Sequence, residues 1–178
     1  AGASVTEAVV TGVDPDRHVV RTAAGDELPF DLLLLAPGAV PMVAVPGAIC
    51  FRGPRDAEAL RKLLADAAAG IIDRVTFAVP SGASWPLPLY ELALLTRSYL
   101  VDEGAVDVTV GIVTPEDSPL ALFGHAASDA VAELLEARGI ELLLSTSPLA
   151  FADGGLSTAP AGVLPSDRVV ALPRLEGP

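Results

Sequence analysis

The sequence predicts an α/β fold in which a parallel sheet carries helices on both faces, with an antiparallel β-meander beside it. From residue 74 onward, apolar strand-like runs alternate with helical runs in the order β-α-β-α-β. The first 35 residues instead hold strand-like runs separated by short turns. Hydrophobic residues make up 51% of the chain and aromatic residues only 4%, which suits an aliphatic core between a parallel sheet and helices.

Composition also narrows the class of partner and the compartment. The net charge of −12 argues against binding bare nucleic acid, because neutralising phosphates requires clustered Lys and Arg. The single cysteine, Cys50, can form neither an internal disulfide nor a thiolate metal site alone, and His18 and His125 lie far apart, so we expect no metal site. With no apolar run of about 18 residues and no signal peptide, we expect a cytoplasmic protein without a transmembrane segment.

The first segment predicts the β-meander. Residues 4–13, 18–22 and 28–35 have strand-like patterns, and short turns such as Asp14-Pro15-Asp16 separate them. The run DLLLLA, residues 31–36, is apolar on both faces and is therefore expected to be the most buried part of the three strands.

A proline-rich segment, residues 37–46, predicts an extended linker. A helix is expected to follow over residues 54–69, because Pro54 suits a first helical turn and Gly70 suits a helix end. Its apolar stripe consists of Ala57, Leu60, Leu63, Leu64 and Ala67.

The second half of the chain predicts a Rossmann-like arrangement of parallel strands joined by helices. Gly139 is expected to end the last helix, and residues 151–155 to form a hairpin turn in an otherwise turn-rich tail. The expected strands are residues 74–79, 106–113, 140–144 and 169–172, and the expected helices are residues 87–101 and 126–138.

The loop between the first of these strands and its helix departs from a dinucleotide-binding loop. A G-x-G-x-x-G fingerprint lets the backbone approach a pyrophosphate and supplies free N–H groups at the helix start. Here Gly82 is the only glycine, Pro86 and Pro88 lack N–H groups, and Trp85 adds bulk. The loop therefore argues against ordinary pyrophosphate binding.

The same loop can still bind another ligand, because open α/β sheets place ligands at the carboxyl ends of their strands. The alternatives are that Trp85 plugs an empty crevice, that Glu91 only complements the helix dipole, and that Glu116 belongs to a solvated turn. No catalytic residue is predicted. The cofactor-binding candidates are Ser81, Gly82, Ser84, Glu91 and Glu116, and the substrate-binding candidates are Trp85 and Tyr90.

Several motifs resemble those of the FAD-dependent pyridine nucleotide-disulfide oxidoreductases, a family with relatives such as sulfide:quinone oxidoreductases and type II NADH dehydrogenases. Asp31, the Ala36-Pro37-Gly38-Ala39 run and the Pro46-Gly47 pair match the segment by which these proteins leave their FAD domain, with Pro37 in place of the usual Thr. Further similar stretches are FRGPRDAEALRKLL, YELALL and RVVALPRL.

The resemblance implies a fragment of an FAD-dependent oxidoreductase. Residues 1–48 and 167–178 would belong to an FAD-type domain, and residues 49–166 would form a degenerate NAD(P)-binding-type domain. FAD would bind to the full-length protein and not to this fragment, which is not expected to be active alone. Ser84, Pro86 and Leu89 stand at the three glycine positions of the motif, which argues against NAD(P) binding.

The expected partners are a small-molecule substrate or a quinone, together with the remaining FAD domain of the same chain. The sequence gives no oligomeric state. The alternative is a non-catalytic nucleotide-fold module that serves assembly or interaction and binds no dinucleotide.

Overall fold

The computed structural model describes residues 2–177, which form two compact units, one up to Gly38 and the other from Ala39 onward. The domain boundaries inferred from the resemblance, after residues 48 and 166, stay predictions. Each unit is described by itself.

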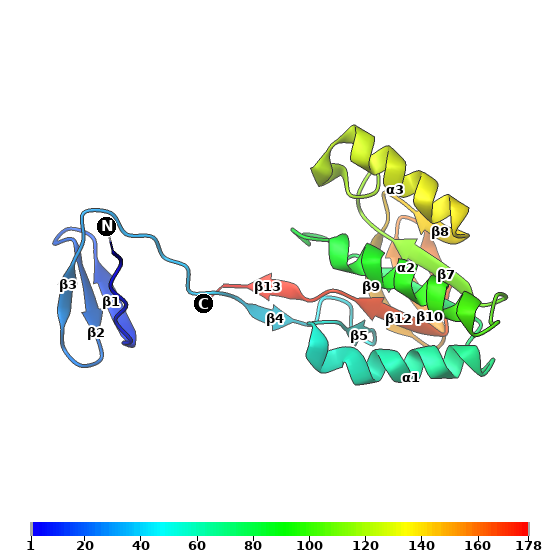
Figure 1. Cartoon of the computed structure of the whole chain (residues 1–178), viewed down its shortest axis with the longest axis horizontal. Coiled ribbons are helices and arrows are strands. Elements are labelled where there is room, and N and C mark those ends of the chain that lie inside the picture. Colours follow the sequence, from blue (N-terminus) through cyan, green and yellow to red (C-terminus); the bar gives the residue numbers. More distant parts are fainter. Residues whose placement is uncertain (1, 178) are drawn as a thin grey trace. The chain divides into compact units, whose positions relative to one another are not determined.

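The first unit contains the predicted β-meander (Figure 1). Strands β1 (Val10–Asp14), β2 (Val19–Thr22) and β3 (Glu27–Pro29) pair antiparallel in the order β1-β2-β3. Val19 and Val20 are its buried hydrophobic residues. Three strands are stable on their own only when they bury a substantial apolar face. With so few buried hydrophobic residues, the meander gains little stability from its own core.

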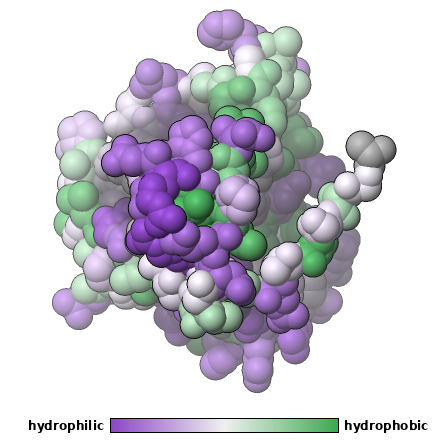
Figure 2. All heavy atoms as spheres, turned by 90° about the vertical axis from the view of Figure 1, so that its left-hand side faces the viewer, coloured by the Kyte–Doolittle hydropathy of each residue, from purple (hydrophilic) through white to green (hydrophobic). Residues whose placement is uncertain are grey.

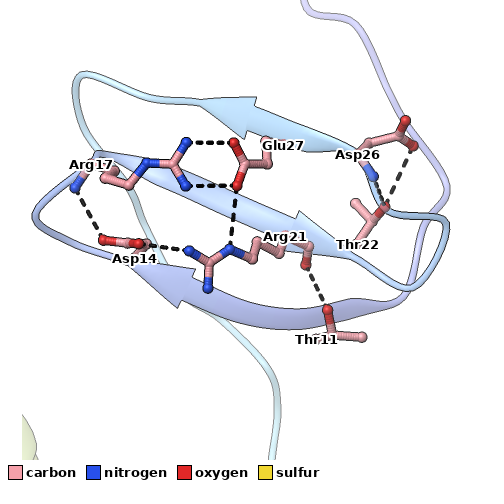
Figure 3. Close-up of polar contacts among 7 residues, drawn as sticks. All are labelled: Thr11, Asp14, Arg17, Arg21, Thr22, Asp26 and Glu27. Atoms are coloured by element: carbon pink, nitrogen blue, oxygen red, sulfur yellow. Dashed lines mark hydrogen bonds and ion pairs between the residues drawn. The ribbon is translucent and has the colours of Figure 1, made fainter.

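A network of charged side chains ties the three strands together on one face of the meander (Figure 3). The Arg17 guanidinium donates two hydrogen bonds, of 2.9 and 2.7 Å, to the Glu27 carboxylate, and Arg21 donates one of 2.7 Å to Asp14. The hydrogen bond from Arg17 lowers the pKa of Glu27. Figure 2 shows hydrophilic side chains gathered over this unit, consistent with a face that meets solvent.

The run DLLLLA is not the buried strand that its composition predicts. Strand β3 ends at Pro29, and the side chains of Leu32 and Leu34 are 91% and 89% exposed. A strand that is apolar on both faces needs a covering layer on each side. The three-stranded meander supplies neither layer to these leucines.

The second unit is built on a five-stranded parallel sheet in the order β5-β12-β6-β7-β8, which confirms the predicted α/β, Rossmann-like fold class. Its central strands β6, β7 and β12 are rich in valine, as expected of strands that are buried on both faces. The strands are β5 (Ile49–Cys50), β6 (Arg74–Ala78), β7 (Thr109–Val113), β8 (Ile140–Leu143) and β12 (Arg168–Ala171).

The helices lie close to their predicted positions. Gly70 and Gly139 follow two of them with positive φ angles of 71° and 64°, as expected of glycines that end helices. The helices are the 3₁₀ turns η1 (Pro54–Asp56) and η2 (Ala121–Phe123) and the α-helices α1 (Ala57–Ala68), α2 (Leu87–Asp102) and α3 (His125–Ala137).

In the described residues, the three α-helices contribute to one buried cluster on the parallel sheet. Val75 and Phe77, which point to one face of β6, pack in a cluster with Leu63 of α1 and Leu89 of α2, and α3 contributes Leu135 to the same cluster. Residues on the opposite face pack against a second, antiparallel sheet instead. That second cluster consists of Val45, Ala78, Val113, Leu156, Val169 and Ala171.

This covering sheet comes from the tail that was predicted to be turn-rich. Strands β9 (Ser147–Ala152), β10 (Gly155–Ala159) and β11 (Gly162–Pro165) pair antiparallel, and the predicted hairpin turn joins the first two. The sheet is anchored at Pro46, whose carbonyl accepts a 2.8 Å hydrogen bond from the amide of Phe151. A Cβ on Gly47 would lie 1.9 Å from the Phe151 carbonyl oxygen, so only glycine fits there.

The segment predicted as a linker contains an edge strand. Strand β4 (Val40–Met42) pairs antiparallel with β13 (Arg174–Glu176), with Pro41 opposite Leu175. A two-stranded ribbon tolerates this proline, because one side of each strand needs no ladder partner. No helix in the described part of the chain is both long and apolar enough to cross a bilayer.

Candidate functional site

A cavity of about 350 Å³ lies at the carboxyl ends of β5, β12 and β6. From β6 the chain proceeds through α2 to β7 on one side, while β12 lies on the other side, so the strand order reverses beside β6. Open α/β sheets bind ligands at this reversal point, outside the carboxyl ends of the strands. The lining residues are Phe51, Arg52, Gly53, Gly82, Ala83, Ser84, Trp85, Pro88, Leu172, Pro173 and Leu175.

The loop after β6 turns sharply before it reaches the cavity. The amide of Ala83 donates a 3.1 Å hydrogen bond to the carbonyl of Pro80, and Gly82 has a φ of 80° at the third position of this turn. This geometry is that of a type II turn, which favours glycine at that position. The hydroxyl of Ser81 donates a 2.9 Å hydrogen bond to the hydroxyl of Ser147, which ties the loop to β9.

The first turn of α2 offers few donors to an anion. Pro88 has no N–H group, and the amide of Leu89 donates a 2.9 Å hydrogen bond to the carbonyl of Pro86. The amide of Leu87 is therefore the one left among the first three residues of the helix. A pyrophosphate held at a helix start needs several convergent amides, and this turn does not provide them.

Trp85 is a wall of the cavity and does not plug it. Its side chain is 52% exposed, and its ring meets that of Phe123 edge to face with the ring centroids 5.4 Å apart. The hypothesis that Trp85 fills the crevice is therefore wrong. The prolines and the indole change the chemistry of the crevice, which remains open.

Among the described residues, Arg52 is the one charged residue that lines the cavity, and a neighbouring carboxylate balances its charge. Its backbone amide and its guanidinium donate hydrogen bonds of 2.8 and 3.1 Å to the carboxylate of Asp56. The amide hydrogen bond from Arg52 is the main cause that lowers the pKa of Asp56, so the carboxylate stays ionised beside the guanidinium.

Comparison with known proteins places this geometry in a fold family. No family model matches the sequence, and no curated protein is similar to it. Among solved structures, the sulfide:quinone oxidoreductase of Aquifex aeolicus superposes with a TM-score of 0.75 at 23% identity, over 96% of this chain and 42% of that chain. A ferredoxin reductase from Rhodopseudomonas palustris superposes with a TM-score of 0.59 at 20% identity, over 91% of this chain and 39% of that chain.

The chain has the fold of the FAD-dependent pyridine nucleotide-disulfide oxidoreductases. The resemblance inferred from the sequence motifs is thereby confirmed at the level of fold. The chain spans about two fifths of the length of these two solved proteins. A chain in the mitochondrial ATP synthase of Tetrahymena thermophila also shares the fold, with a TM-score of 0.62 at 16% identity, over 96% of this chain and 47% of that chain.

Within this reductase-type fold, the predicted site residues fall into two groups. Gly82, Ser84 and Trp85 line the cavity, and Ser81 lies next to them in the loop. Glu91 is exposed on α2 and is not part of the cavity wall. The roles assigned to these residues stay predictions.

Tyr90 and Glu116 contact each other away from the cavity. Tyr90 is 1% exposed, and its hydroxyl donates a 2.7 Å hydrogen bond to Oε2 of Glu116. The hydroxyl of Thr114 donates a second bond, of 2.9 Å, to the same oxygen. Burial, followed by the bond to Glu116, raises the pKa of Tyr90 well above its usual value.

Sequence reasoning missed the part of the cavity that β5 and β12 provide. Phe51 and Arg52 follow β5, and Leu172 and Pro173 follow β12. The signal was present in principle, because each pair comes directly after a parallel strand and such positions meet at one edge of the sheet. In the described residues, no cluster of three or more His, Cys, Asp or Glu side chains is placed to hold a metal ion.

Proposed function

We propose that the chain is the nucleotide-fold domain, with flanking strands, of a longer FAD-dependent oxidoreductase, and that the cavity beside β6 forms one wall of the site for its substrate or electron acceptor. The observation that carries the proposal is the position of the cavity. It lies at the reversal point of the sheet, in a fold shared with oxidoreductases that are more than twice as long as this chain.

In this proposal FAD binds to the part of the protein beyond this chain. The first unit and the β4–β13 ribbon contribute to that FAD-type domain, which accounts for the exposed leucines Leu32 and Leu34. NAD(P) does not fit the loop after β6, because the start of α2 lacks convergent amides. The electron donor is therefore something other than a nicotinamide held in the usual way.

The test is to purify the complete protein and record its visible absorption spectrum. Flavin bands, with FAD identified by mass spectrometry after release from the protein, would support the proposal. Under anaerobic conditions, we expect neither NADH nor NADPH to reduce the flavin on the time scale of a catalytic cycle. A complete protein that is colourless, and that remains so after refolding with added FAD, would overturn the proposal.

A second candidate function is a non-catalytic module for assembly. It is favoured by the fold similarity to a chain of the Tetrahymena thermophila ATP synthase, and by a helix start that suits no diphosphate. The two candidates differ in one observable: the module predicts stable association with other subunits and no flavin in the purified complex. Size-exclusion chromatography with absorbance detection in the visible range separates them.

A further inference from the structure

We infer that the cavity beside β6 binds a neutral, flat, mostly apolar ring compound and selects against anionic ligands. The inference deepens the proposed function, because it assigns a chemical class to the substrate or acceptor of that site. Three features of the cavity support it: an apolar lining that includes an exposed indole, a cation already paired with a carboxylate, and a limited volume.

The lining is apolar on several sides. Phe51 follows β5, Leu172 and Pro173 follow β12, and Leu175 comes from β13, so several segments bring hydrophobic side chains to one space. Trp85 adds an indole that is 52% exposed and braced edge to face by Phe123. A flat ring can stack on the exposed part of that indole, and such aromatic pairs add about 0.5–1.5 kcal/mol to simple burial.

The charges around the cavity do not attract an anion. The Arg52 guanidinium is paired with Asp56, so the single cation of the lining is already neutralised. The start of α2 keeps one free amide at Leu87, and the chain as a whole carries a net charge of −12. An anionic ligand would therefore lose hydration without gaining a strong partner, whereas a neutral ligand has little hydration to lose.

The remaining polar group suits a carbonyl or hydroxyl substituent. Ser84 lines the cavity and is exposed, so its hydroxyl can donate to or accept from a ligand. The cavity volume of about 350 Å³ is at the small end of ligand pockets, which fits one or two fused rings and not a whole dinucleotide.

The test compares two probes that share a naphthalene ring on the 178-residue chain: 2-naphthol, which is neutral at pH 7, and 2-naphthoate, which is anionic. Trp85 is the only tryptophan, so its indole N–H gives one resolvable signal in a ¹H–¹⁵N NMR spectrum. We expect 2-naphthol to shift this signal saturably and to bind at least tenfold more tightly than 2-naphthoate. Equal or tighter binding of 2-naphthoate, or no shift with either probe, would overturn the inference.

Two pairs of variants locate the effect, with calorimetry as the readout. Trp85→Ala should weaken 2-naphthol binding severalfold, while Trp85→Phe, which keeps a flat ring, should retain most of it. Asp56→Asn releases the charge of Arg52 and should strengthen 2-naphthoate binding by about two- to fivefold, the scale of one partly exposed ion pair. Asp66→Asn, which breaks the Lys62–Asp66 pair on α1, removes the same charge and should leave both affinities unchanged.

The outcomes separate this inference from the proposed function. Binding of 2-naphthol in a protein that holds no flavin would support the site and overturn the oxidoreductase proposal. A complete protein that contains flavin, but whose Trp85 indole signal does not shift with 2-naphthol, would support the oxidoreductase proposal and overturn the proposed ring-binding site. If Asp56→Asn and Asp66→Asn change the affinity for 2-naphthoate equally, the charge balance between Arg52 and Asp56 does not select the ligand, and the inference fails.

Discussion

The hydroxyl of Tyr90, on α2, donates a 2.7 Å hydrogen bond to Oε2 of Glu116, in the segment after β7. In a dinucleotide-binding sheet, an acid at the end of the second strand holds a ribose hydroxyl. Here that carboxylate oxygen already accepts bonds from Tyr90 and Thr114, so it serves the protein's own packing. The acid is thus occupied by the protein's own hydroxyl groups, and the helix start offers few amides to a diphosphate.

Replacing Tyr90 by Phe should destabilise the fold. The change keeps the buried ring and removes the hydroxyl, so Oε2 of Glu116 loses one of its two donors. Leaving a part-buried carboxylate short of a donor is expected to lower the free energy of unfolding by about 1–2 kcal/mol. Chemical denaturation measures this. Tyr99→Phe, a half-buried position on the same helix, is the matched control and should change stability by less.

The same hydrogen bond predicts how stability depends on pH. Burial raises the pKa of Tyr90 above its usual value of 10.0, so the folded state favours the protonated phenol. The resulting stabilisation is fully present below pH 10 and is lost as the pH rises further. Tyr90→Phe should therefore flatten the fall in unfolding free energy above this pH. An unchanged slope in the variant would contradict the assignment.

Gly47 should tolerate no side chain. Its φ is 83°, and an added Cβ would lie 1.9 Å from the carbonyl oxygen of Phe151, at the point where β9 is anchored. Gly47→Ala should cost roughly 3 kcal/mol or more, because backbone must move. Gly104→Ala is the control: its φ is 77° but the space is open, so only the left-handed conformation is penalised, by about 1 kcal/mol. Similar losses in both variants would refute the packing explanation.

The buried Arg97 should act as a structural clamp between α2 and the strands that follow. Its guanidinium donates to the carbonyls of Val106, Val108 and Gly139 at 3.3, 2.9 and 3.5 Å. Arg97→Met leaves these carbonyls short of a donor and should lower the unfolding free energy by about 1–3 kcal/mol.

The control for Arg97 is Arg61→Met, on the exposed surface of α1, which should be nearly neutral. Arg97→Lys should recover only part of the loss, because an ammonium group does not reproduce the fork of a guanidinium. Thermal unfolding of the three variants decides the matter, and full rescue by lysine would contradict a role in bridging several carbonyls.

The parallel sheet and its helices could be predicted because local signals and tertiary packing agree there. Pro54 at a helix start, Gly70 and Gly139 at helix ends, and the apolar strand around Phe77 each specify one conformation. The Pro46-Gly47 pair of the family-like motif coincides with a position where only glycine fits, because a Cβ on Gly47 would meet the carbonyl oxygen of Phe151.

Other features depend on partners that are distant in the sequence. The covering sheet was missed because residues 145–165 contain many turn formers, and only pairing with one another reveals their strands. The exposure of Leu32 and Leu34 depends on which layers are present, which a local pattern does not encode. Arg52 escaped notice because its place in the cavity follows from the order of strands in the sheet and not from a motif.

The fold keeps its crevice but lacks the backbone N–H donors that would hold a cofactor's diphosphate. Isothermal titration of the chain with NADH and NADPH tests this most directly. We expect no saturable heat up to millimolar concentrations of either dinucleotide. Saturable binding with a submicromolar to micromolar Kd, accompanied by a shift of the Trp85 indole signal, would contradict it.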